Sequence, residues 1–314
     1  MGAHGMVIAW KLPGDGVGAL TMCDFDQSCQ PGVLLETEYS AMELTDLTGD
    51  GAKDLLLLAS DQSGKRVARL YRYAHGALDL AGETGTTTEA VMIERMSSGY
   101  VRDQQLAVFA EERTTGGVGL TTDIFVYADG KLQNLALDSE DSMGRGTYRP
   151  VSVYAADING DGITELPRAV LMAGYTEQSA DALYMLDWYA YGADAAPELV
   201  LTTYQNVSDG WTLTIDPAWH DMITAMKSSE SGLNAVTFSQ YVSKDKQIPL
   251  FTIYSATGTA KEYYATRDDL IQLGQTAKTL CFARIADPAQ QSAVQIDAAG
   301  IQSRFSLIAQ DWNN

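Results

Sequence analysis

Cysteine, histidine and basic residues are scarce in this sequence of 314 residues, which has 3 cysteines, 3 histidines and 21 basic residues against 41 acidic ones. The formal net charge of −20 repels phosphate backbones and argues against nucleic-acid binding. No apolar run approaches the roughly 20 residues of a membrane-spanning helix. Three cysteines are too few for a disulfide scaffold, although Cys23 and Cys29 are close enough in sequence to bridge a turn. We therefore expect an acidic globular protein without a transmembrane segment.

Recognisable catalytic motifs are also missing. The sequence has no G-x-S-x-G elbow, no H-E-x-x-H pair and no P-loop, and the glycine-rich stretch Gly14–Gly18 has the wrong spacing for phosphate. His220 beside Asp221 is the one acid/base candidate, and a surface histidine next to an aspartate usually has no catalytic role. The 41 acidic residues allow many carboxylate pairs suited to glycoside hydrolysis, but the sequence singles out none. We therefore expect a protein that is not an enzyme and assign no catalytic residue.

The first six residues, 1–6, are interpreted as a cloning remnant rather than as part of the fold. They lack the basic and apolar regions of a signal peptide. An exported protein could have been trimmed at this point, so a signal or a lipid anchor on a removed N-terminus is compatible with the sequence.

Most of the chain has the pattern of short β-strands separated by turns. Apolar runs such as Asp54–Ala59 and Leu106–Phe109 are separated by glycine-containing turn signals, and Asp129–Gly130 predicts a tight hairpin. Helical periodicity is hard to find before about residue 215. Near the end of the chain, Asp297 is a good N-cap for a helix. The pattern predicts a mainly β fold with an α+β region at the C-terminus.

Two stretches, Asp46–Leu55 and Asp157–Leu166, repeat one another. In each, the first, third, fifth and ninth residues carry side-chain oxygens, and glycines occupy the fourth and sixth positions, where a chain wrapped around a small cation must turn sharply. Calcium takes about six to eight oxygen ligands in flexible geometry. An EF-hand would need a glutamate at the twelfth position, which is Leu57 or Arg168 here, and flanking helices. The stretches therefore predict calcium sites in hairpins, with ordinary Asp-Gly turns as the alternative.

The spacing of these stretches indicates a repeat. They begin 111 residues apart (157 − 46), and Ser98–Leu106 lies halfway, before a similar strand but without the acidic ligands. Units of about 50–60 residues, each a small antiparallel sheet, have the period of propeller blades. Three blades do not close a ring, so either further blades precede residue 1 or the arrangement is open. The expected divisions are 37–86, 87–146 and 147–206 for the units, 7–206 for the whole repeat region and 207–314 for a separate α+β domain.

The succession of a strand, the pattern D-x-[N/D]-G-D-G-x-x-[D/E]-L and an apolar strand resembles FG-GAP/VCBS-type repeats, as in the calcium-binding blades of integrin α-chain propellers. The resemblance implies propeller-like antiparallel blades with calcium held between neighbouring strands of a blade. The Phe-Gly and Gly-Ala-Pro elements of the integrin repeat are missing, and the resemblance covers only about residues 40–205. The ligands it implies are Asp46, Thr48, Asp50, the Ala52 carbonyl and Asp54 in the first stretch, and Asp157, Asn159, Asp161, the Ile163 carbonyl and Glu165 in the second.

The 16 tyrosines and 5 tryptophans form local clusters. We expect them mainly to pack between sheets; exposed, they would suit stacking on sugars or contact with a protein partner. The clusters are Tyr184, Trp188, Tyr189 and Tyr191, and Tyr263 with Tyr264.

Together these patterns predict a non-enzymatic, calcium-binding protein of the binding or adhesion type, exported to the cell surface or the extracellular space. Calcium would be structural, and the partner would be a protein or a glycan. The strand-rich sequence with its α+β tail also looks like bacterial surface lipoproteins. The alternatives are a secreted hydrolase that acts on glycan or peptide and uses the blades as a scaffold, and a purely structural spacer.

Overall fold

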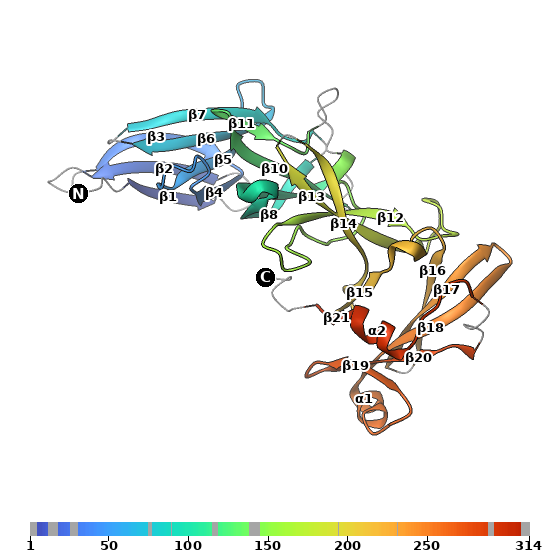
Figure 1. Ribbon diagram of the computed structural model, residues 1–314. Helices are drawn as coiled ribbons and strands as arrows, with labels where there is room; N and C mark the ends of the chain where they lie inside the picture. The colour runs from blue at the N-terminus through green and yellow to red at the C-terminus, as the bar shows by residue number, and fades with distance from the viewer. Residues whose placement is uncertain are drawn as a thin grey trace. The chain divides into compact units, whose positions relative to one another are not determined.

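The protein, as a computed structural model, is built from short antiparallel strands (Figure 1). The structure describes residues 5–11, 18–25, 31–74, 77–88, 90–114, 119–137, 145–193, 195–230, 232–287 and 292–308. Cys29, the first four residues and residues 14–17 of the glycine-rich stretch lie outside these ranges, whereas Cys23 is buried. The expectation of a mainly β fold with several antiparallel sheets is confirmed, and the described residues show no closed propeller.

Helices are few and short within the described ranges. The α-helices are α1 (Gly258–Tyr264) and α2 (Ala298–Arg304), and three single turns of 3-10 helix are η1 (Arg102–Gln104), η2 (Arg145–Thr147) and η3 (Pro217–Trp219). None of these helices is long and apolar enough to cross a membrane.

The described strands form five sheets. Their bounds are β1 Gly5–Lys11, β2 Gly18–Phe25, β3 Pro31–Tyr39, β4 Ala41–Thr45, β5 Asp54–Ser60, β6 Arg66–Ala74, β7 Ala77–Gly85, β8 Ala90–Val101, β9 Gln105–Thr114, β10 Leu120–Ala128, β11 Lys131–Asn134, β12 Glu165–Leu171, β13 Tyr184–Gly192, β14 Ala195–Asn206, β15 Trp211–Ile215, β16 Ile223–Glu230, β17 Leu233–Ser243, β18 Lys246–Thr257, β19 Ile271–Gln275, β20 Thr279–Ile285 and β21 Phe305–Leu307. Sheet 1 has the order β1-β2-β3, sheet 2 β4-β5-β6-β7, sheet 3 β8-β9-β10-β11, sheet 4 β12-β13-β14-β15-β21 and sheet 5 β16-β17-β18-β20-β19. In sheets 1 to 3 each strand therefore pairs with the next one along the chain.

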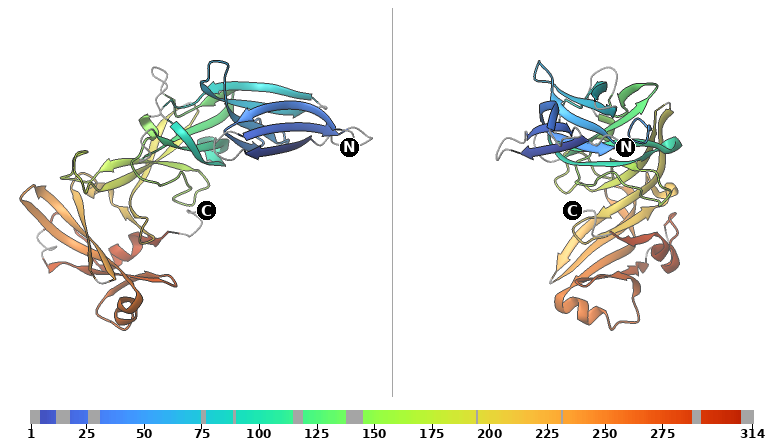
Figure 2. Two further views of the ribbon diagram at one scale, coloured as in Figure 1. Left: turned by 180° about the vertical axis from the view of Figure 1, so that it is seen from behind. Right: turned by 90° about the vertical axis from the view of Figure 1, so that its left-hand side faces the viewer.

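Strand β5 contains four consecutive leucines, with no alternation of apolar and polar residues, because both faces of this strand are buried. Leu55 and Leu57 pack against β2 of sheet 1, whereas Leu56 and Leu58 pack against β9 and β10 of sheet 3. In both views of Figure 2 the blue strands of sheet 1 lie alongside the strands of sheet 2. Sheet 2 is thus covered on one face by sheet 1 and on the other by sheet 3.

The chain divides into two compact units. Unit 1 comprises Met1–Arg168 and Tyr189–Leu199, and unit 2 comprises Ala169–Trp188 and Val200–Asn314. Sheets 2 and 3 lie within the expected divisions 37–86 and 87–146. The division expected between residues 206 and 207 falls inside a hairpin, because Asn206 pairs with Trp211 across the turn that joins β14 to β15.

Unit 2 has an aromatic core. Trp211 and Phe238 are fully buried and both contact the ring of Tyr204, with ring centroids 5.6 and 5.3 Å away. The helix expected after Asp297 is confirmed as α2: the Asp297 carboxylate accepts a hydrogen bond from the backbone N–H of Gly300 at 2.7 Å.

Candidate metal sites in two hairpin loops

The two Asp-rich stretches are loops, and in both the residue just before the loop pairs with the loop's ninth residue. Loop 1 (Asp46–Asp54) follows β4, and the residue before it, Thr45, pairs with its ninth residue. Loop 2 (Asp157–Glu165) is preceded by Ala156, which forms an isolated antiparallel bridge with Glu165, again the ninth residue. Both loops therefore close the same span of chain before a buried strand, β5 or β12.

The first aspartate of each loop accepts hydrogen bonds from the backbone. In loop 1, Asp46 Oδ1 accepts from the N–H of Asp50 at 3.0 Å and Oδ2 accepts from the N–H of Gly51 at 2.9 Å. In loop 2, Asp157 makes the same two contacts with the fifth and sixth residues, at 3.1 and 2.9 Å. The same hydrogen-bond pattern therefore shapes both loops.

Glycine is required at the fourth and sixth positions by backbone conformation. Gly49 and Gly51 have φ of 75° and 89°, and Gly160 and Gly162 have φ of 81° and 89°, a region that side chains with a Cβ rarely adopt. A Cβ added at any of the four would meet nothing within 4 Å, so conformation and not crowding selects glycine.

The ninth residue of each loop is a buried carboxylate with only one oxygen satisfied. Asp54 is 1% exposed and accepts from the backbone N–H of Thr48 at 2.8 Å through Oδ2; Glu165 is 0% exposed and accepts from the N–H of Ile158 at 3.0 Å through Oε2. Asp54 Oδ1, Glu165 Oε1 and the Thr48 hydroxyl are buried and make no hydrogen bond of ordinary geometry, although the Thr48 hydroxyl lies near the Asp54 carboxylate. A buried carboxylate oxygen without a hydrogen-bond donor lowers the stability of the fold, and a positively charged partner would remove this penalty.

The environment disfavours the charged form of both buried carboxylates. Burial raises the pKa of Asp54, opposed by the amide and nearby hydroxyl of Thr48 and reinforced by the charges of Asp50 and Asp46. Burial raises the pKa of Glu165 to about 7, and the other loop carboxylates add to this effect. A bound cation would reverse this penalty because it neutralises the loop's negative charges.

Asp61, in the turn between β5 and β6, shows what an ordinary aspartate turn looks like in this chain. Its Oδ1 accepts from the backbone N–H and the hydroxyl of Ser63, at 2.8 and 2.7 Å, and from the N–H of Lys65 at 2.9 Å. These hydrogen bonds, led by the Ser63 hydroxyl, lower the pKa of Asp61. Loops 1 and 2 differ from this turn because each holds a buried carboxylate that the protein leaves half satisfied.

The expected ligands do not converge on one point in the described parts of the chain. There, no group of three or more His, Cys, Asp or Glu side chains has the arrangement to hold a metal ion. Asp50 Oδ1 and Asp161 Oδ1 instead accept from the N–H groups of Ala52 and Ile163, at 2.9 and 2.8 Å, and Asn159 Nδ2 donates to Asp161 at 2.9 Å. The donor set is all oxygen and so fits calcium in chemistry, and the exposed carboxylates Asp50 and Asp161 would have to turn toward the ion.

The corresponding hairpin of sheet 3 has an arginine in place of a carboxylate cluster. Between β8 and β9 the chain forms η1, where Asp103 and Gln104 have φ of 62° and 56°. Arg102 donates to the carbonyl of Ala196 at 2.8 Å and pairs with Glu198 at 3.2 Å. This hairpin therefore supplies its own positive charge and offers no site for a cation.

His220 is held between two carboxylates. Its Nδ1 lies 2.9 Å from Asp221, and its Nε2 lies 3.2 Å from Asp187, which is buried and also accepts from the Thr202 hydroxyl at 2.6 Å. Burial alone would lower the pKa of His220, but the hydrogen bond to Asp221 and the charge of Asp187 outweigh it and raise the pKa. Both ring nitrogens are engaged, so the geometry favours a charged structural pair over a proton-transfer role.

Unit 2 should therefore lose some stability as pH rises through the raised folded-state pKa of His220. Because the folded-state pKa of His220 is raised, its contribution is complete below the unfolded-state pKa and disappears as pH rises through the folded-state pKa. We expect His220→Asn to remove this component, worth about 1 kcal/mol for a pair whose histidine is still partly reached by solvent. Urea unfolding at pH 5.5 and 8.5, followed by tryptophan fluorescence, measures the difference from the unmodified chain. Equal pH dependence in both proteins would contradict it.

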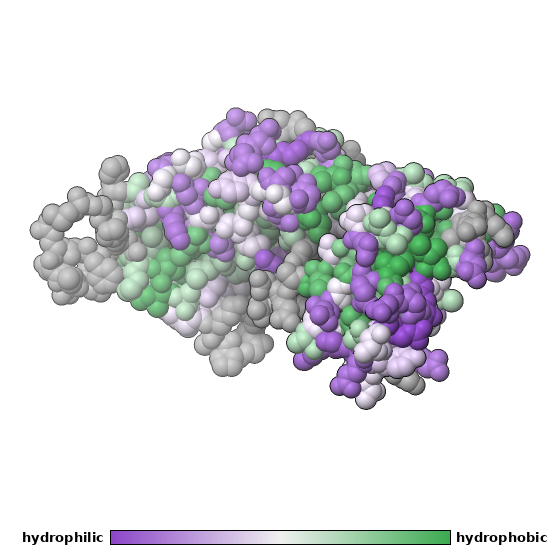
Figure 3. All heavy atoms as spheres, turned by 60° about the horizontal axis from the view of Figure 1, so that its bottom comes forward, coloured by the Kyte–Doolittle hydropathy of each residue, from purple (hydrophilic) through white to green (hydrophobic). Residues whose placement is uncertain are grey.

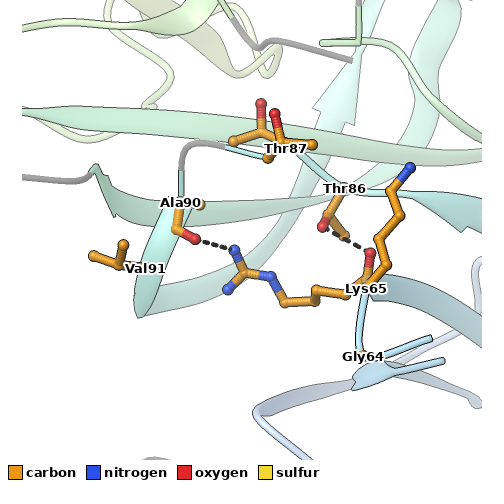
Figure 4. A pocket seen from close by; sticks show the side chains of 8 residues that line it. Gly64, Lys65, Thr86, Thr87, Ala90 and Val91 are labelled. Carbon is orange, nitrogen blue, oxygen red and sulfur yellow. Dashed lines mark hydrogen bonds between the residues drawn. The ribbon is translucent and has the colours of Figure 1, made fainter. Parts of the chain in front are cut away.

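A hollow of about 330 Å³ beside Arg66 lies between the β5–β6 turn and the β7–β8 connection. Figure 4 shows the carbonyl of Ala90 turned toward the guanidinium group, which donates to it at 2.8 Å and also pairs with Glu112 at 3.3 Å. Burial and the charge of Asp123 raise the pKa of Glu112 well above its ordinary value, and burial raises the pKa of Asp123 to about 6. Neither carboxylate has exposed surface, so neither can touch a substrate here. The sequence does carry a signal for the cluster of Arg66, Glu112 and Asp123, because the two acidic residues stand within apolar strands.

The aromatic clusters divide between packing and exposure. Trp188 and Tyr191 are buried, as expected for packing, whereas Tyr263 is 57% exposed. Arg168 lies over the ring of Tyr189, 4.2 Å from its centroid. Figure 3 shows hydrophobic side chains in several separate areas of one face, with hydrophilic side chains between them.

Comparisons with known proteins add no relatives: no protein-family model, no curated protein and no solved structure matches this chain.

Proposed function

We propose that loops 1 and 2 each bind one calcium ion, and that the ion stabilises the hairpin it occupies. The observation that carries this proposal is the repeated geometry of the ninth residue: in both loops a buried carboxylate keeps one oxygen without a hydrogen-bond donor. The ion would be held by the oxygens of Asp46, Thr48, Asp50, the Ala52 carbonyl and Asp54, and by those of Asp157, Asn159, Asp161, the Ile163 carbonyl and Glu165. Its role would be to neutralise these carboxylates and fix the turn.

We further propose that sheets 2 and 3 are propeller-type blades of the FG-GAP/VCBS kind. Each is a four-stranded antiparallel sheet whose strands follow one another along the chain, which is the form of a propeller blade. The proposed calcium of loop 1 lies within such a blade, between β4 and β5. If these sites have the millimolar affinity typical of extracellular modules, they would suit an exported or cell-surface protein.

The function that follows is a non-enzymatic binding protein, with calcium as a structural ion and a protein or glycan as its partner. A bacterial surface lipoprotein would fit this description. The secreted-hydrolase alternative has no comparable observation behind it, because the carboxylate pair formed by Glu112 and Asp123 has no exposed surface.

Thermal unfolding with excess EDTA and then with millimolar calcium tests the proposal. At calcium concentrations about tenfold above the dissociation constant, each site should add about 1–2 kcal/mol. For a unit of this size, this corresponds to a rise in Tm of about 2–4 °C per kcal/mol. Asp50→Ala and Asp161→Ala should each remove part of the rise.

Asp61→Ala is the matched control, because it removes an aspartate from an ordinary turn of the same unit and should leave the calcium response unchanged. A Tm that calcium does not change in the unmodified chain would reduce both loops to ordinary turns.

A further inference from the structure

A second polar hollow, of about 340 Å³, lies in unit 2 beside the turn that joins β14 to β15 and the β16–β17 hairpin. Amide and hydroxyl side chains dominate its lining, together with one carboxylate and one ammonium group. The side chains that carry the argument are Asn206, Ser208, Asp209, Lys227, Ser229 and Asn234.

Five of these side chains form one hydrogen-bonded relay with Asp209 at its centre. The carboxylate accepts from Asn206 Nδ2 at 2.9 Å through Oδ2 and from Asn234 Nδ2 at 2.7 Å through Oδ1. Each amide oxygen in turn accepts from a serine hydroxyl: Ser208 donates to Asn206 at 2.8 Å, and Ser229 donates to Asn234 at 2.7 Å. The relay fixes the orientation of both amides, because each nitrogen faces the carboxylate and each oxygen faces a hydroxyl.

The relay leaves an alternating set of donors and acceptors for a ligand. Each amide group has a second N–H that the relay does not use, and the Asp209 oxygens and the serine oxygens keep lone pairs. Lys227, on the hollow's lining, adds an ammonium donor. Paired donors and acceptors at fixed positions match neighbouring hydroxyl groups, since each hydroxyl can donate one hydrogen bond and accept others.

Burial makes the relay rigid on one side and accessible on the other. Asn206 is 2% exposed, and Asp209 and Asn234 are half-buried, whereas Ser208, Ser229 and Lys227 are exposed. A partly buried polar network that is oriented before binding loses less conformational freedom when a ligand arrives. Its buried end is fixed by the fold and its exposed end can meet a molecule from solution.

We propose that this hollow binds one neutral sugar residue of a glycan, whose vicinal hydroxyl groups take hydrogen bonds from the amide of Asn234 and the ammonium group of Lys227 and donate to Asp209. The carboxylate at the centre disfavours an anion. Lys227 and the two amide donors already directed at Asp209 disfavour a metal ion. No aromatic ring lines the hollow, so a single sugar should bind with a dissociation constant in the millimolar range.

This inference names the ligand class of the proposed binding protein and rests on that proposal only for its biological meaning. The calcium loops lie in unit 1 and the hollow lies in unit 2. The two proposals can therefore fail separately.

Saturation-transfer difference NMR of the full chain with glucose, galactose, mannose and N-acetylglucosamine tests the hollow, with glycerol as a polyol control. We expect saturable binding of at least one sugar and not of glycerol, both in EDTA and in calcium. Asp209→Ala should weaken the binding about tenfold or more, since it removes a charged acceptor and releases both amides. Asn234→Ala should weaken it in the same direction.

Asp269→Ala is the matched control: it removes a carboxylate from the same unit, one that is paired with Arg267 at 2.6 Å outside the hollow. It should leave sugar binding unchanged. Circular dichroism shows whether each variant is folded, and Ser229→Ala, at the exposed rim, replaces Asp209→Ala if that variant does not fold. The proposal is overturned if no sugar binds, if glycerol binds equally, or if binding persists unchanged in the folded hollow variants. A calcium-dependent rise in Tm without sugar binding would remove only the ligand assignment.

Discussion

Replacing Arg149 with methionine should lower the stability of unit 1 by about 3–5 kcal/mol, because it leaves a buried carboxylate without its counter-charge. Arg149 and its partner Glu111 are both 0% exposed. Both side chains are shielded from solvent, so water cannot replace a lost partner. The loss of stability should therefore exceed that caused by breaking a solvent-exposed ion pair.

The Arg149–Glu111 pair belongs to a fully connected polar network. The guanidinium group donates to Glu111, to the carbonyl of Val153 and, at 3.0 Å, to the hydroxyl of Thr122. Glu111 also accepts from the Thr122 hydroxyl and from the backbone N–H of Ala155, both at 2.6 Å. The network therefore fixes the chain between residues 149 and 155 against β9 and β10, just before loop 2 begins. Its loss should be visible both in global stability and in local opening of this segment.

Urea unfolding gives the change in free energy, and hydrogen–deuterium exchange of peptides from residues 145–165 locates it. Arg149→Met combined with Glu111→Leu should recover part of the loss, because two apolar side chains leave no unpaired charge, although the Thr122 hydroxyl and the backbone groups of Val153 and Ala155 lose their partners. Arg69→Met is the control: Arg69 pairs with the partly exposed Glu83 at 2.7 Å, and such a pair contributes about 0–1 kcal/mol. An Arg149→Met protein as stable as Arg69→Met would show that the buried pair contributes no more than a surface one.

The local features of the fold were predictable from the sequence, but the long-range ones were not. The leucine run of β5 and the glycines at the fourth and sixth loop positions follow from local physics, namely burial on both faces and positive φ. Arg149 and Glu111 lie 38 residues apart in sequence, and no local pattern couples them. The one available signal was the Glu111–Glu112 pair inside an apolar strand, which indicates partners that the sequence does not name.

The exact division of the chain into its two units could not be predicted from the sequence for a similar reason. The turn after Asn206 has the same polar composition whether it links two domains or two paired strands. Pairing decides between these: β14 pairs with β15, and β15 pairs with β21, so that Trp211 lies opposite Leu307. A strand partner almost a hundred residues away leaves no trace in local composition, so the sequence could not show that the expected division between residues 206 and 207 falls inside a hairpin.

Glu165→Gln should have opposite effects on two quantities: it should raise the stability of the chain in EDTA and reduce the stabilisation that calcium adds. In EDTA at pH 8.5, well above the Glu165 pKa of about 7, the carboxylate is charged while buried, so the neutral amide should stabilise the chain by about 1–3 kcal/mol. The amide oxygen can still accept the hydrogen bond from the N–H of Ile158. With millimolar calcium the substitution removes a charged ligand, so the variant should gain less from the ion than the unmodified chain. Tm values measured in both conditions give the two signs.

Asp61→Asn is the control for these two effects of Glu165→Gln, because hydrogen bonds lower the pKa of Asp61 and its charged form is the stabilised one. It should destabilise the chain equally in EDTA and in calcium. Asp54→Asn should behave like Glu165→Gln, since burial also raises the pKa of Asp54. If Glu165→Gln instead lowers the Tm in both conditions, the carboxylate acts as a simple turn former like Asp61. A higher Tm in EDTA together with a smaller calcium response for the loop 2 variant, and neither for Asp61→Asn, requires a positive partner that binds from solution, which an ordinary turn does not need.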